Sequence, residues 1–294
     1  MRVERQPTGL LRAWPNRDRL LHMATEAFPD HPLISVTDVV HGIAIHARVS
    51  VPAIADASVP LVFVHGLGVS VRYLEPTMAR LGRAYYVAGL DLPGFGRSGS
   101  PPHVLNLEEL SSALAAWLDT RDIGPAILVG NSYGCQIIVD LVSREPSRAL
   151  GLVLNAPTMD PAHRSVPGVA LRLLADAAFE PWGLALIVAR DYWRAGARRV
   201  LATVRHARND PLEEKLAGIL LPTVIVAGAR DTVVSVGWAR EAARLVGIST
   251  RAAPGATLHV LPNAAHALPF DDPVSFAALI DAFVDRVRAL RQAR

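Results

Sequence analysis

Ser132 is the residue whose surroundings point most directly to chemistry. It lies in the stretch Val-Gly-Asn-Ser-Tyr-Gly-Cys, residues 129–135, which fits the pattern Gly-x-Ser-x-Gly. An apolar run precedes this turn, and a segment with helical spacing follows it at once. A buried strand, a tight turn between glycines and a helix N-terminus together expose a serine where the helix dipole favours negative charge. The same residues also fit a tight turn with a solvent-facing serine, so the motif alone leaves both interpretations open.

A serine hydroxyl is a weak nucleophile at neutral pH, and it needs a base that an acid holds in place. His266 and Asp231 each follow the end of a predicted strand, which is where open α/β sheets place their sites. We therefore predict Ser132 as the nucleophile, His266 as the base and Asp231 as the acid. Asp160, which follows another predicted strand, is the alternative acid.

The other nine histidines are weaker candidates for the base. They lie in predicted strands, in the N-terminal segment, in loops or in a helical insertion: His22, His31, His41, His46, His65, His103, His163, His206 and His259. Histidines in such places are usually structural or solvated. His65 precedes Gly66, which favours a role in shaping the loop 65–68.

Two backbone N–H groups are expected to bind the oxyanion that forms when a serine attacks a carbonyl. One belongs to the residue after the nucleophile, Tyr133, and the other comes from the loop after an earlier strand, for which Leu67 is the best candidate. Cys135 falls one turn into the following helix, and we expect it to be a small packed residue.

The sequence Gly-Phe-Gly-Arg-Ser-Gly, residues 94–99, matches the dinucleotide-binding pattern Gly-x-Gly-x-x-Gly. In that fingerprint the last glycine opens a helix. Here Ser-Pro-Pro follows at 100–102. We therefore interpret the segment as a glycine-rich loop and expect no organic cofactor.

Strand and helix patterns alternate along most of the chain. We predict a hairpin at 37–50, strands at 60–66, 85–94, 126–130, 149–155, 223–229 and 257–261, and helices at 108–119, 135–144, 238–246 and 273–290. Such alternation predicts an α/β fold with a mostly parallel sheet covered by helices on both faces. For residues 1–35 we expect an irregular arm with at most one short helix.

The alternation stops between Pro157 and Leu221, where successive amphipathic helices are predicted. This gives a core domain of residues 1–157 and 216–294, with a helical insertion at 158–215. The insertion carries four arginines that either bind a carboxylate or solvate the outer face of its helices: Arg190, Arg194, Arg198 and Arg199.

Composition narrows the class of protein. The 294 residues are 51% hydrophobic and 19% charged, which is typical of a globular enzyme, and a formal net charge of +3 does not imply a nucleic-acid partner. One cysteine excludes a multi-cysteine metal site, and we expect no metal. No apolar run reaches the length of a membrane span, and the N-terminus has no signal-peptide pattern. We expect a cytoplasmic protein with a small-molecule substrate, either a monomer or a homodimer.

Five motifs occur in one order along the chain: His-Gly-Leu-Gly at 65–68, Asp-Leu-Pro-Gly-Phe-Gly-Arg-Ser-Gly at 91–99, Gly-Asn-Ser-Tyr-Gly at 130–134, Gly-Ala-Arg-Asp at 228–231 and Asn-Ala-Ala-His at 263–266. In this combination the sequence resembles the α/β-hydrolase superfamily over roughly residues 37–290. The resemblance implies the triad Ser132, Asp231 and His266, an oxyanion hole at Leu67 and Tyr133, and a cap formed by the insertion.

These features lead to the expectation of a serine hydrolase, most simply a carboxylesterase acting on a small or medium apolar substrate. One alternative is carbon–carbon bond hydrolysis. Asn131 resembles the residue before the nucleophile in meta-cleavage-product hydrolases, but Ala267 stands where those enzymes usually have a tryptophan. The other alternative is a non-catalytic receptor or binding protein with the same fold.

Overall fold

The computed structural model describes residues 33–51, 56–161, 164–176, 181–249 and 255–293. Within them, eight strands form one sheet in the order β1-β2-β4-β3-β5-β6-β7-β8. The strands are β1 Leu33–Val40, β2 Ile43–Ser50, β3 Asp56–Val64, β4 Tyr85–Leu90, β5 Ala126–Asn131, β6 Ala149–Asn155, β7 Thr223–Gly228 and β8 Ala256–Leu261. From β4 to β8 every neighbouring pair is parallel, whereas β2 is antiparallel to both β1 and β4. The predicted fold class is therefore confirmed.

The predicted hairpin is formed by β1 and β2. Its two-residue turn, His41 and Gly42, has positive φ at both positions, 49° and 77°. Both central residues of a type I′ turn need this conformation, which matches the twist of the strands that it joins. The hairpin begins earlier than predicted, because Leu33 already pairs with Ser50. Apart from these first residues of β1, the expected N-terminal arm lies outside the described residues.

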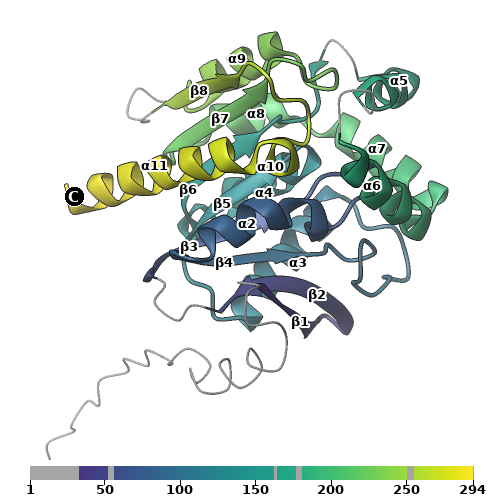
Figure 1. Cartoon of the computed structure of the whole chain (residues 1–294), viewed down its shortest axis with the longest axis horizontal. Coiled ribbons are helices and arrows are strands. Elements are labelled where there is room, and N and C mark those ends of the chain that lie inside the picture. The colour runs from purple at the N-terminus through teal and green to yellow at the C-terminus, as the bar shows by residue number, and fades with distance from the viewer. Residues whose placement is uncertain (1–32, 52–55, 162–163, 177–180, 250–254, 294) are drawn as a thin grey trace, which may run out of the picture.

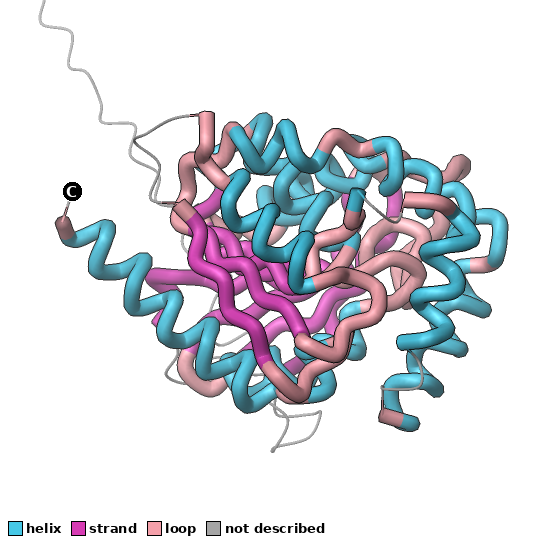
Figure 2. The backbone as a smooth tube through the Cα atoms, turned by 90° about the horizontal axis from the view of Figure 1, so that it is seen from above, coloured by secondary structure: helices cyan, strands magenta, loops and turns pink. Residues whose placement is uncertain are grey.

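Helices cover the sheet on both faces (Figures 1 and 2). On one face lie α3 (Leu107–Thr120), α4 (Tyr133–Arg144), α8 (Leu212–Ala217) and α9 (Val236–Leu245), and on the other lie α2 (Glu75–Leu81), α10 (Leu268–Asp271) and α11 (Pro273–Gln292). The buried apolar residues form two hydrophobic cores, one on each face of the sheet, and β3 contributes to both. Val62 and Val64 belong to one core, whereas Leu61 and Phe63 belong to the other. Alternate residues of a strand face opposite sides, so a strand buried on both faces must be apolar throughout.

Two predicted elements differ from the structure. The strand expected at 85–94 ends at Leu90, because Asp91 instead accepts hydrogen bonds from the backbone N–H groups of Val71 and Arg97. Residues 91–99 then form a loop. The helix α2, which no sequence pattern indicated, has only seven residues and follows the short 3-10 helix η1 (Val71–Leu74) directly.

The segment between β6 and β7 is helical, as predicted. It contains α5 (Val166–Asp176), α6 (Trp182–Ala195), α7 (Ala197–Asn209) and α8. Figure 1 shows α6 and α7 together at the right of the sheet. Tyr192 of α6 lies against Gly68, and Arg199 of α7 donates to the carbonyl of Gly94 at 2.7 Å. These two loops follow the carboxyl ends of β3 and β4, so α6 and α7 lie over that edge of the sheet. α8 packs against α4 and α9 instead.

Candidate active site

Ser132 stands at the sharp turn between β5 and α4. Its backbone has φ 56° and ψ −122°, a conformation rare for any residue but glycine, and it is the N-cap of α4. The flanking glycines are sterically required. A Cβ on Gly134 would lie 2.2 Å from the carbonyl oxygen of Val64, and one on Gly130 would lie 2.8 Å from the amide nitrogen of Cys135. The structure thus gives the Gly-x-Ser-x-Gly pattern the strand, turn and helix that the sequence predicts.

His266 and Asp231 form a buried pair. His266 Nδ1 lies 2.9 Å from Asp231 Oδ2, while the other carboxylate oxygen accepts the N–H groups of Val233 and Val234 at 2.7 and 2.8 Å. Burial lowers the pKa of His266, but the charge and hydrogen bond of Asp231 outweigh it, so the net pKa lies above the ordinary 6.5. Because an ionised carboxylate only accepts, Nδ1 carries the proton and Nε2 is left to accept one. His266 is 8% exposed and Ser132 is 9% exposed.

The loop 65–68 lies directly beside Ser132. A Cβ on Gly66 would be 3.3 Å from the Cβ of Ser132. His65 shapes this loop, as predicted: its Nδ1 donates to the carbonyl of Gly66 at 2.7 Å, and its Nε2 accepts the N–H of Leu92 at 3.0 Å. Burial lowers the pKa of His65, so this imidazole is neutral and both its nitrogens are occupied.

The two N–H groups predicted for the oxyanion hole have no partner within the described part of the chain. The N–H groups of Gly66, Ser132 and Cys135 all donate hydrogen bonds, whereas none is recorded for the backbone N–H of Leu67 or of Tyr133. Buried or half-buried N–H groups are normally paired. Two free donors on either side of a serine are therefore available to a ligand oxygen.

Tyr73 joins the loop 65–68 to the serine turn, although no sequence motif pointed to this residue. Its hydroxyl accepts the N–H of Gly66 at 2.9 Å and donates to Oδ1 of Asn131 at 2.6 Å. Asn131 in turn donates through Nδ2 to the carbonyl of His266 at 3.2 Å. The Asn131 side chain thus holds three parts of the site together: the loop at Gly66, the serine turn and the histidine loop. These contacts account for Asn131 without a role in recognising a substrate.

The remaining sequence candidates lie elsewhere. Asp160, the alternative acid, accepts the hydroxyl of Ser235 at 2.8 Å, whereas the carboxylate on His266 Nδ1 is that of Asp231. Cys135 is fully buried, and burial raises the pKa of its thiol, as expected for a packed residue. Residues 94–99 form a loop rather than the start of a helix, and a Cβ on Gly96 would collide with the carboxylate of Asp91.

The described residues hold no group of three histidine, cysteine or acidic side chains placed to ligate a metal ion. None of the helices in the ranges given above is both long and apolar enough to cross a lipid bilayer.

The four arginines of the insertion have three different surroundings. Arg199 is a structural residue, because its guanidinium packs over Gly94 and donates to that residue's carbonyl. Arg190 and Arg194 line a cavity with arginines from other elements, whereas Arg198 is exposed and does not line it.

Comparisons with known proteins agree with this architecture. The curated relatives include a protein of Mycobacterium phage D29, provisionally named a non-heme haloperoxidase, which is 37% identical over 108 residues, covering 36% of this chain and 38% of that protein. The AB hydrolase superfamily protein YisY of Bacillus subtilis is 24% identical over 63% of this chain and 79% of its own. Four of the curated relatives are matched over only 38%, 26%, 27% and 62% of their own length.

Among solved structures, the enol-lactonase from Burkholderia xenovorans LB400 superposes with a TM-score of 0.70 at 21% identity, covering 85% of this chain and all of that one. Identity at this level shows a shared fold. The family comparison is more specific, because a model described as the alpha/beta hydrolase family matches residues 61–279, which is more than half of the chain. This protein therefore belongs to the α/β-hydrolase family.

Proposed function

We propose that this protein is a serine hydrolase that cleaves ester-type bonds in a small or medium apolar substrate. The observation that carries the proposal is the pair of free backbone N–H groups, those of Leu67 and Tyr133, beside a serine on a strained turn. Donors placed where negative charge develops are the largest single contribution to acyl-transfer catalysis. The buried pair of His266 and Asp231 supplies the base and its orienting acid.

In the proposed reaction, Ser132 Oγ attacks the carbonyl carbon of the ester while His266 Nε2 takes the hydroxyl proton. Asp231 holds Nδ1–H and stabilises the imidazolium that forms. The oxyanion accepts the N–H groups of Leu67 and Tyr133. His266 then protonates the departing alcohol, which leaves an acyl-enzyme on Ser132. Water, activated by the same imidazole, hydrolyses this ester and restores the serine. None of these steps requires a metal or an organic cofactor.

Carbon–carbon bond hydrolysis with the same triad is the alternative reaction. The feature that suggested it is Asn131, and its side chain is already occupied by Tyr73 and by the carbonyl of His266. The contacts of Asn131 therefore favour neither reaction. Ester hydrolysis is the simpler proposal, because attack on an ester carbonyl needs only the groups already named.

The experiment compares Ser132→Ala with the control Cys135→Ser, which changes the buried thiol of α4 three residues further along the chain. We expect Ser132→Ala to lower kcat/KM for p-nitrophenyl esters by roughly 10³-fold or more, as loss of a covalent nucleophile does, and Cys135→Ser to retain activity. Wild-type protein is also tested on a ring-cleavage diketo acid by loss of its chromophore. Equal ester hydrolysis by folded Ser132→Ala would refute the serine mechanism, and turnover of the diketo acid alone would replace the ester assignment. Wild-type protein inactive on both classes would favour a binding protein.

A further inference from the structure

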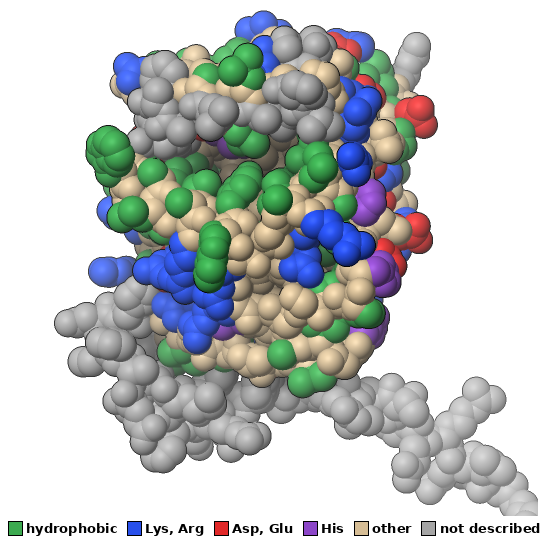
Figure 3. All heavy atoms as spheres, turned by 90° about the vertical axis from the view of Figure 1, so that its right-hand side faces the viewer, with side chains coloured by type: hydrophobic (Ala, Val, Ile, Leu, Met, Phe, Trp, Pro, Cys, Tyr) green, Lys and Arg blue, Asp and Glu red, His purple; other side chains and the backbone are tan. Residues whose placement is uncertain are grey.

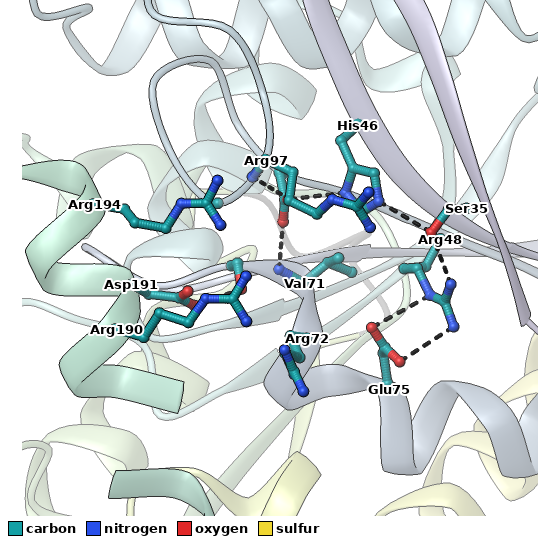
Figure 4. A pocket seen from close by; sticks show the side chains of 13 residues that line it. Ser35, His46, Arg48, Val71, Arg72, Glu75, Arg97, Arg190, Asp191 and Arg194 are labelled. Carbon is teal, nitrogen blue, oxygen red and sulfur yellow. Dashed lines mark hydrogen bonds and ion pairs between the residues drawn. The ribbon is translucent and has the colours of Figure 1, made fainter. Parts of the chain in front are cut away.

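An arginine-rich cavity of about 270 Å³ lies apart from the candidate active site. Five arginines from four elements line it: Arg48 of β2, Arg72 of η1, Arg97 of the loop after β4, and Arg190 and Arg194 of α6. Figure 4 shows Arg190 and Arg194 reaching from α6 into this space, opposite Arg97. Ser132, Asp231 and His266 are not among its lining residues. We call this space the arginine pocket.

The acidic groups of the arginine pocket are already used within the protein. Asp91, only 1% exposed, forms a hydrogen bond with Nδ1 of His46 at 2.8 Å and accepts two backbone N–H groups. Asp191 accepts the hydroxyl of Ser70, and burial raises the pKa of this carboxyl. Glu75 pairs with Arg48 at 3.3 Å. These carboxylates hold the walls of the pocket together, and five arginines against three carboxylates leave its lining with a net charge of +2.

Four arginines of the pocket form no ion pair within the described residues: Arg72, Arg97, Arg190 and Arg194. On the face of the molecule that carries α6 and α7, Figure 3 shows basic side chains gathered in a dense cluster beside exposed hydrophobic ones. Like charges around one cavity repel each other, and this cost is removed when an anion binds between them. The four arginines come from three separate elements, so the fold itself brings them together.

We propose that the arginine pocket binds a ligand through phosphate groups. Guanidinium groups donate two parallel hydrogen bonds, which match the oxygens of a phosphate, and a phosphate carries more charge than a carboxylate. A ligand with more than one phosphate fits best, because arginines from several elements surround a space of about 270 Å³ and leave it with net positive charge.

Inorganic pyrophosphate is the probe, titrated into wild-type protein by calorimetry at low ionic strength. The test variant is Arg190→Gln with Arg194→Gln, two exposed side chains of α6. The control is Arg198→Gln with Arg205→Gln, which removes the same charge from exposed positions of α7 outside the pocket. Loss of two charged hydrogen-bond donors should weaken pyrophosphate binding roughly tenfold or more. The control variant should bind pyrophosphate as tightly as wild type does. Added salt should weaken the binding of pyrophosphate to wild type and to the control variant alike.

Three outcomes would overturn the proposal. The first is no heat of binding with millimolar pyrophosphate, and the second is equal weakening in the test variant and its control. The third is tighter binding of citrate than of pyrophosphate, which would assign the pocket to carboxylates. Ester hydrolysis measured on the same samples reports that both variants are folded, since neither pair touches the candidate active site.

The phosphate can belong to a free metabolite or to a lipid headgroup, and vesicles distinguish the two. Trp182 and Trp193, on the same helix as the two arginines, are 89% and 84% exposed, and exposed tryptophan suits a membrane interface. If the phosphate belongs to a lipid headgroup, the protein should sediment with vesicles that contain phosphatidic acid but not with vesicles of phosphatidylcholine alone. The double variant Trp182→Ala with Trp193→Ala should reduce this sedimentation, and so should Arg190→Gln with Arg194→Gln. A free source predicts pyrophosphate binding with no sedimentation. Sedimentation unaffected by Arg190→Gln with Arg194→Gln would contradict the pocket as the headgroup site.

Discussion

At the scale of single residues, the backbone of Ser132 carries strain. A positive φ at a residue with a Cβ costs of order 1–3 kcal/mol, which the surrounding strand, glycines and helix must offset. The strain fixes the direction of the serine side chain beside the loop 65–68. Alanine at this position has the same Cβ and bears similar strain. Ser132→Ala therefore removes the hydroxyl with little change in the turn, which makes it a clean test of the mechanism.

The pairing of His266 with Asp231 predicts the pH dependence of the proposed reaction. The base acts in its neutral form, and the pKa of His266 is raised above 6.5, so kcat/KM should fall on the acid side of a midpoint that lies above 6.5. Asp231→Asn removes the charge that raises this pKa. The midpoint should then move to lower pH, and kcat/KM at the plateau should drop roughly 10³–10⁴-fold, as in triads that lose their acid.

The control for Asp231→Asn is Asp160→Asn, at the acid that the sequence left as an alternative. Asp160 is held by Ser235, so its replacement should leave the acid limb of a kcat/KM profile between pH 5 and 9 unchanged. A profile that shifts with Asp160→Asn and not with Asp231→Asn would reverse the assignment of the acid.

At the scale of elements, Tyr73 of η1 positions the loop 65–68 against the end of β5. Tyr73→Phe leaves the N–H of Gly66 and the side chain of Asn131 without this partner, which typically costs 1–3 kcal/mol. We expect kcat/KM for esters to fall roughly tenfold, chiefly through kcat, because the N–H of Leu67, which we propose as an oxyanion donor, loses the support of its loop.

The matched control is Tyr85→Phe, which removes a hydroxyl that forms a hydrogen bond with Asp281 of α11, outside the contacts described for the candidate site. It should change the melting temperature without changing kcat. If Tyr73→Phe lowered only the melting temperature, Tyr73 would be a stabilising residue and not a positioning one.

The sequence predicts most elements because their signals are local. The apolar runs of β3, β5, β6 and β7 and the amphipathic spacing of α3, α9 and α11 each lie within one segment. α2 escaped prediction because seven residues give too few turns for a periodic pattern. β4 was predicted too long because Leu92 continues its apolar pattern, while contacts of Asp91 with distant residues end the strand.

At the scale of the whole molecule, α6 limits the space beside the loop 65–68. The ring of Tyr192 would lie within 2.8–3.3 Å of a Cβ on Gly68. If the insertion acts as the predicted cap, Tyr192→Ala enlarges the acyl-binding space. We expect the ratio of kcat/KM for p-nitrophenyl octanoate to that for the acetate to rise several-fold.

Trp193→Ala, at the exposed neighbour of Tyr192, is the control for a general effect of altering α6. Its ratio of octanoate to acetate hydrolysis should equal that of wild type. Equal ratios in Tyr192→Ala and wild type would mean that α6 does not border the acyl-binding space.

Contacts between distant segments mark the limit of prediction from the sequence. The placement of Ser132, Asp231 and His266 after strands could be predicted, because parallel strands bring their carboxyl ends to one edge of the sheet. No such rule relates Tyr73 to Asn131, or Arg97 to Arg190, whose proximity depends on how η1, a loop and α6 pack. The sequence also leaves open whether the arginines of the insertion bind an anion or are solvated. Arg190 and Arg199 cannot be told apart from the sequence, because their different roles depend on the residues that pack against them.

The central claim is that Ser132 is a nucleophile activated by its surroundings, and covalent trapping tests it most directly. A fluorophosphonate reacts only with an activated serine, and intact-mass spectrometry counts the groups attached. Wild-type protein and Cys135→Ser should each gain one phosphonyl group, mapped by peptide sequencing to Ser132, whereas Ser132→Ala should gain none. Wild-type protein that stays unlabelled, or Ser132→Ala labelled to the same extent as wild type, would contradict the account.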